Sequence, residues 1–88
     1  MKNFTLEKLR AEMERSRRLH GGNAKMIPAL AEEVGEMCNA LLEHERGNKT
    51  AQDVFDEAIQ VAATALRIAE EGDRDFLYRP EEVIPDKP

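Results

Sequence analysis

Residues 50–71 read TAQDVFDEAIQVAATALRIAEE, and their apolar side chains return every three or four positions, as they do on one long helix. The apolar positions are Val54, Phe55, Ala58, Ile59, Val61, Ala62, Ala65, Leu66, Ile68 and Ala69. Together they cover nearly half of the helix circumference, and so wide an arc needs more than one neighbouring helix to bury it. We therefore expect a helical bundle that a short chain completes by self-association, as a homodimer or homotetramer.

The boundaries of this helix are marked in the sequence. Thr50 and Asp53 have the spacing of a side-chain cap at a helix N-terminus. Gly72 and Asp73 follow the last apolar positions, and glycine tolerates the backbone conformation that ends a helix. We expect the helix to run from about residue 50 to residue 71.

Two more helices are predicted upstream. Apolar residues at helical spacing predict a helix over about 5–20, with Thr5 as its cap. The next helix ends at Glu45 and begins at Ala24 or near Pro28, because proline fits well only in a first turn. Its apolar face consists of Ile27, Leu30, Val34, Met37, Cys38 and Leu41. No segment alternates like a strand, so the predicted fold class is all-α, an antiparallel helical bundle.

Length and composition exclude several classes of protein. The chain has 88 residues, which allows one domain; we assign residues 1–79 to it and residues 80–88, which hold three prolines, to an extended tail. The net charge of −5 disfavours a nucleic-acid polymer as partner, and no apolar run is long enough to cross a membrane. A single cysteine and a charged start without an apolar signal segment indicate a cytoplasmic location.

Three carboxylates lie within one turn of the second predicted helix. Glu32, Glu33 and Glu36 share the side opposite the apolar face, where like charges repel one another unless a cation lies among them. Mg²⁺, or Mn²⁺ in its place, prefers oxygen ligands of this kind. The alternative interpretation is an ordinary solvated helix face, which carries charge for solubility alone.

The third predicted helix carries a matching polar stripe. Asp53, Glu57, Gln60 and Thr64 follow one another at spacings of four, three and four residues, along one edge of the apolar arc. A short loop before this helix makes it the antiparallel neighbour of the second helix. Glu57 and Gln60 can therefore face the three glutamates, and the two helices together predict an oxygen-lined metal site.

The segments AEEVGEM (31–37) and EAIQVA (57–62) resemble the MazG-like all-α nucleoside triphosphate pyrophosphohydrolases, whose signature is E-E-x-x-E followed by E-x-x-D. The resemblance implies Mg²⁺-dependent cleavage of a nucleoside or deoxynucleoside triphosphate into a monophosphate and pyrophosphate. It implies catalytic roles for Glu33 and Glu36. The metal ligands that it implies are Glu32, Glu33, Glu36, Glu57 and Gln60.

The chain departs from this pattern at Gln60, where the family has Asp. An amide oxygen can coordinate a cation but adds no negative charge, and Asp53 is one candidate to compensate. We assign substrate binding to Lys25, Asp53 and Arg67. The departure keeps a second hypothesis open, in which the chain is a non-catalytic dimerisation or regulatory module on the same scaffold.

Overall fold

The computed structural model describes residues 1–85, and the last residues of the predicted tail, 86–88, lie outside the described part. The elements are α1 (Asn3–Leu19), α2 (Met26–Glu45), α3 (Ala51–Glu71) and the 3-10 turns η1 (Arg74–Phe76) and η2 (Pro80–Glu82). The described residues contain no strand, only one isolated bridge between Asp73 and Tyr78. The all-α prediction is confirmed. None of the helices within 1–85 is long and apolar enough to cross a membrane.

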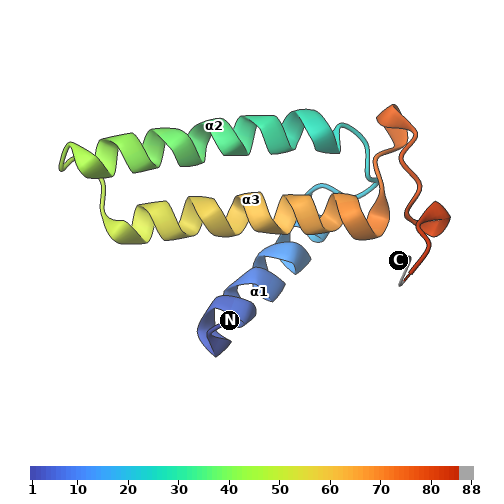
Figure 1. Cartoon of the computed structure of the whole chain (residues 1–88), viewed down its shortest axis with the longest axis horizontal. Coiled ribbons are helices and arrows are strands. Elements are labelled where there is room, and N and C mark those ends of the chain that lie inside the picture. Colours follow the sequence, from blue (N-terminus) through green and yellow to red (C-terminus); the bar gives the residue numbers. More distant parts are fainter. Residues whose placement is uncertain (86–88) are drawn as a thin grey trace.

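α2 and α3 form an antiparallel hairpin, and α1 packs on α3 (Figure 1). Leu9 and Met13 of α1 are buried against Ala63 of α3, next to the partly buried Ala62. Figure 1 shows α1 crossing α3 obliquely, whereas an antiparallel bundle was expected. The contact continues on both sides of this core, because the Phe4 ring stacks on the Phe55 ring of α3 and the Ser16 hydroxyl accepts from Arg67.

The predicted boundaries of α3 are confirmed. Thr50 is the residue before the helix, and its backbone N–H donates to the Asp53 carboxylate at 2.8 Å. The Asp53 N–H donates in return to the Thr50 hydroxyl oxygen at 3.1 Å, which completes a reciprocal cap. At the other end, Gly72 terminates the helix with a φ of 81°.

The starts of the other two helices differ from prediction. α1 begins at Asn3, so Thr5 lies inside the helix, and Lys2 precedes it without a side-chain cap. α2 begins at Met26, between the two predicted starts, and Pro28 lies in its first turn. Lys25 precedes α2 in the left-handed conformation, with a φ of 57°, and its side chain makes no cap either.

The cap of α2 comes from the segment after α3. The Ile27 N–H donates to the carboxylate of Asp73 at 2.7 Å, and the Lys25 N–H donates to that of Asp75 at 2.9 Å. Asp73 is fully buried. We call residues 72–78 the capping segment, because their carboxylates satisfy amide groups that the start of a helix leaves free.

The predicted apolar face of α2 is largely uncovered in the single chain. Val34 is 37% exposed and Leu41 is 49% exposed, and Cys38, for which a core position was expected, is also exposed. On α3, Leu66 is 37% exposed. The cause is the position of α1, which covers α3 and leaves the outer side of the hairpin without a neighbour.

Candidate functional site

Two of the predicted carboxylates have oxygens that are buried without a partner. The Oε2 atoms of Glu33 on α2 and Glu57 on α3 are both inaccessible to solvent, and neither has a hydrogen-bond partner. Leaving a carboxylate oxygen in this state costs free energy, so native structures rarely keep one without a functional reason. Both residues are half-buried and lie on the two helices of the hairpin.

Glu33 is the centre of a cluster of negative charges. Burial raises the pKa of Glu33, and the hydroxyl of the buried Thr64 counteracts part of this rise. The charges of Glu36, Glu12 and Glu57 raise the pKa of Glu33 further. Carboxylates from all three helices therefore act on Glu33, and each of them disfavours its ionised form.

A cavity of about 530 Å³ lies beside Glu33, between the end of α1, the first half of α2 and the second half of α3. Glu32, Glu33 and Glu36 form its acidic wall. The basic residues that line it are His20, Lys25 and Arg67. A volume of this size suits a nucleotide-sized ligand, and the pairing of acidic and basic walls suits phosphates accompanied by a cation.

Arg67 is 1% exposed, and its guanidinium makes hydrogen bonds to α1, to the residue after α1 and to Glu71 of its own helix. Its guanidinium donates to the Ser16 hydroxyl at 2.8 Å, to the His20 carbonyl oxygen at 3.1 Å and to the Glu71 carboxylate at 3.0 Å. Burial alone would raise the pKa of Glu71, but the hydrogen bonds and charges of Arg17 and Arg67 outweigh it and lower that pKa. The predicted contact of Arg67 with substrate would have to compete with these bonds.

Lys25 lines the cavity, but two backbone N–H groups at the start of α2 already donate to carboxylates of the capping segment. Helix N-termini bind anions through their free N–H groups, and here Asp73 and Asp75 accept from two of these N–H groups. Only the side chain of Lys25 remains to contact a phosphate. The predicted role of Lys25 in substrate binding therefore depends on its ammonium group.

Asp53 does not line this cavity. Its carboxylate accepts from the N–H and the hydroxyl of Thr50, at the loop end of the hairpin. These bonds lower the pKa of Asp53, the backbone N–H having the larger effect. This carboxylate caps α3, so the predicted role of Asp53 in substrate binding or in compensating for Gln60 would have to compete with the cap.

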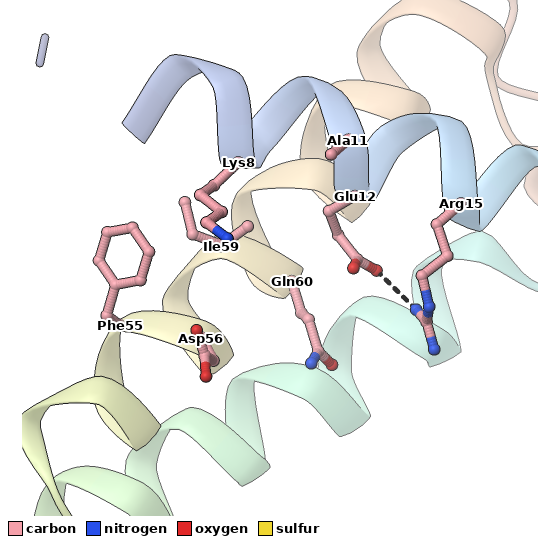
Figure 2. Close-up of a pocket in the computed structure, with 8 residues that line it drawn as sticks. All are labelled: Lys8, Ala11, Glu12, Arg15, Phe55, Asp56, Ile59 and Gln60. Carbon is pink, nitrogen blue, oxygen red and sulfur yellow. Dashed lines mark hydrogen bonds and ion pairs between the residues drawn. The ribbon is translucent and has the colours of Figure 1, made fainter. Parts of the chain in front are cut away.

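Gln60 is among the residues that line a separate cavity of about 190 Å³ between α1 and α3 (Figure 2). Glu12 and Arg15 of α1 line the same cavity, and the Arg15 guanidinium donates to the Glu12 carboxylate at 3.0 Å. Sequence reasoning missed Glu12, because no motif includes it. The one available signal was its position next to Met13, on the border of the buried face of α1.

The predicted ligand set is not assembled around one point. Among residues 1–85, no three His, Cys, Asp or Glu side chains are arranged to hold one metal ion. Glu32 and Glu36 are exposed, whereas Glu33 and Glu57 are half-buried and Gln60 faces α1. A cation would have to draw these side chains together, so the metal site stays a prediction.

Comparisons with known proteins add no assignment. No family model matches the chain, and no curated protein or solved structure is detectably similar to it. The function has to be argued from the site itself.

Proposed function

We propose that the chain is a Mg²⁺-dependent nucleoside triphosphate pyrophosphohydrolase of the MazG-like type. The observation that carries the proposal is the pair of buried, unpartnered carboxylate oxygens on Glu33 and Glu57. Two carboxylates on neighbouring helices repel each other when both are ionised, and a divalent cation between them removes this cost and supplies the missing partners.

The residues near Glu33 fit a magnesium ion chemically. Carboxylates are the ligands that Mg²⁺ prefers, and it keeps several waters when two or three of them bind it. Glu33 and Glu57 would hold it. Glu32, Glu36 and Gln60 are the further ligands that we propose, and they would have to move toward the ion, because the structure does not gather them around one point. Bound there, Mg²⁺ would neutralise phosphate charge and lower the pKa of a water molecule.

The chain's own residues divide the remaining work. The 530 Å³ cavity would accept the nucleotide, and Lys25 and His20 line it together with the carboxylates. One of Glu33 and Glu36 would accept the proton of the attacking water.

The test is an assay of pyrophosphate release from a panel of nucleoside and deoxynucleoside triphosphates with Mg²⁺. We expect turnover of at least one nucleotide, and a loss of roughly 100-fold or more for Glu33→Gln. Glu45→Gln is the matched control, because Glu45 is an exposed glutamate at the far end of the same helix. A panel without turnover, or a fully active Glu33→Gln variant, contradicts the proposal.

The second candidate is a non-catalytic dimerisation or regulatory module, which the uncovered apolar face of α2 favours. A second copy of the chain is the natural cover for Val34, Cys38 and Leu41, and we propose a homodimer or homotetramer in either case. Mg²⁺ separates the candidates, because a ligand that binds the folded state raises the melting temperature. If the chain is such an enzyme, millimolar Mg²⁺ raises its melting temperature. If it is a purely structural module, the melting temperature is the same with and without Mg²⁺.

A further inference from the structure

We propose that Asp75 is a positioning residue for Lys25, and that it directs the Lys25 ammonium toward a phosphate group bound in the 530 Å³ cavity. This inference rests on the proposed function and assigns the phosphate end of that site. Asp75 belongs to the capping segment, whereas Lys25 belongs to residues 20–25, which we call the linker because they join α1 to α2.

The first support is the backbone conformation of Lys25. Its φ of 57° lies in the left-handed region, which lysine adopts only at a cost in free energy. Such a conformation persists where the surrounding structure imposes it, and it is common at ligand-binding positions. Here the Lys25 N–H donates to the Asp75 carboxylate at 2.9 Å, and Lys25 lines the cavity. The bond to Asp75 therefore holds the residue that carries the ammonium.

The second support is that Asp75 is itself held in place. Its N–H donates to Oδ1 of the fully buried Asp73 at 2.9 Å. The other oxygen of Asp73, Oδ2, accepts from the Ile27 N–H at 2.7 Å. The two carboxylates thus hold the start of α2 on either side of Met26. An acceptor fixed in this way can impose a backbone conformation on Lys25.

The third support is a second attachment of the linker, at Asn23. The φ of Asn23 is also positive, at 44°, and its carbonyl oxygen accepts from the Arg74 N–H at 2.9 Å. Its side-chain amide donates to the Glu71 carbonyl oxygen at 2.7 Å. Ala24 and Lys25 of the linker line the cavity. The end of α3 and the capping segment therefore set the form of this cavity wall.

The fourth support is the state of the Lys25 ammonium. Lys25 is exposed, and its ammonium is in no ion pair with any of residues 1–85. The guanidinium of Arg67, by contrast, is engaged by Ser16, Glu71 and the His20 carbonyl oxygen. A phosphate can therefore bind the Lys25 ammonium without breaking an ion pair.

The experiment is a calorimetric titration of the full chain with inorganic tripolyphosphate in the presence of Mg²⁺. We expect Lys25→Met and Asp75→Ala each to weaken binding roughly tenfold, because a charge-assisted contact is removed in the first and misplaced in the second. Asp75→Asn should keep the affinity of the unmodified chain, since its amide oxygen can still accept from the Lys25 N–H. Glu82→Ala is the matched control, because it removes the same charge from an exposed residue of η2.

The sign of the Asp75→Ala effect separates positioning from charge. If Asp75 acted only through its charge, its loss would tighten the binding of an anion. If Asp75 acts through Lys25, Asp75→Ala has no further effect in a chain that already carries Lys25→Met, whereas two independent losses would add. Asp75→Glu keeps the charge but displaces the acceptor, so it should also weaken binding, and it replaces Asp75→Ala if that variant is unfolded at the temperature of the titration.

The outcomes separate this inference from the proposed function. If Lys25→Met weakens binding and Asp75→Ala does not, the phosphate contact stands and the positioning role of Asp75 is wrong. If neither variant weakens binding, or the unmodified chain binds no tripolyphosphate, the inference is overturned, and pyrophosphate release still decides the proposed function. If the variants behave as expected but no nucleotide is cleaved, the proposed function fails and the role of Asp75 stands.

Discussion

Buried polar groups have hydrogen-bond partners at one place on the hairpin of α2 and α3 and lack them at another. At the end formed by the start of α2 and the end of α3, Arg67 and Asp73 are almost fully buried and every bond that they make is to this chain. A few turns away, Glu33 and Glu57 have buried oxygens without any partner. The first region holds the three helices together, and in the second each unpartnered oxygen costs stability.

The contrast teaches which buried charges to interpret as structure and which as function. A buried ion with complete hydrogen bonding fixes the relative positions of elements. A buried carboxylate oxygen without a partner is instead a candidate for a functional role, and this is the basis of the proposed function. Three substitutions test this division.

The largest effect is expected at Gly72, where the capping segment turns back. Its φ is 81°, and a Cβ atom there would collide with the carbonyl oxygen of Tyr78 and lie 2.9 Å from Cδ of Pro80. Gly72→Ala should lower the free energy of unfolding by about 3 kcal/mol. Chemical denaturation measures the change. Gly35→Ala is the control, because its Cβ would meet no atom within 4 Å, and it should stabilise the chain by up to about 1 kcal/mol.

An intermediate effect is expected at Arg67. Arg67→Met keeps the apolar stem but removes the donor to Ser16 and to the His20 carbonyl, and leaves Glu71 with Arg17 alone, which should cost about 2 kcal/mol. Hydrogen exchange should show the end of α1 opening first. The exposed Arg18 at the end of α1 is the control, and Arg18→Met should change the free energy of unfolding by no more than about 0.5 kcal/mol. Equal stability of the two variants would mean that the Arg67 bonds contribute nothing.

The smallest effect has the opposite sign and concerns Glu33. Because the folded chain raises the pKa of Glu33, ionisation costs the folded state more than the unfolded state. This penalty is absent below the unfolded pKa and is complete above the folded pKa. In EDTA, Glu33→Gln should therefore match the unmodified chain in acid and exceed it by about 0.5 kcal/mol at neutral pH. Denaturation curves across this pH range measure it, and a variant that is less stable at pH 7 would contradict the repulsion.

The sequence was sufficient for those features that depend on neighbours along the chain. The extent of α3 follows from an apolar arc of more than five turns, and the cap between Thr50 and Asp53 spans three residues. The proximity of Glu33, Glu36 and Glu57 was likewise predictable, because helix periodicity and a short loop place them on facing sides.

The features that were missed depend on residues far apart in the sequence. Asp73 caps Ile27 across 46 residues, and Arg67 reaches Ser16 across 51 residues. No local sequence pattern predicts such bonds. The bonds of Arg67 to α1 were therefore not foreseen when Arg67 was predicted to bind substrate. The oblique position of α1 was not predicted for the same reason, since its contacts with α3 join residues that are far apart in the sequence.

The cap of α2 also sets an order of events during synthesis. Met26–Glu45 emerges from the ribosome with its first turn incomplete, because the carboxylate that accepts from Ile27 belongs to Asp73, 46 residues further along the chain. The start of α2 therefore lacks this cap until the capping segment has been synthesised. A nascent chain that stalls within α3 presents a frayed helix beside an uncovered apolar face, which is the state in which it most needs a chaperone.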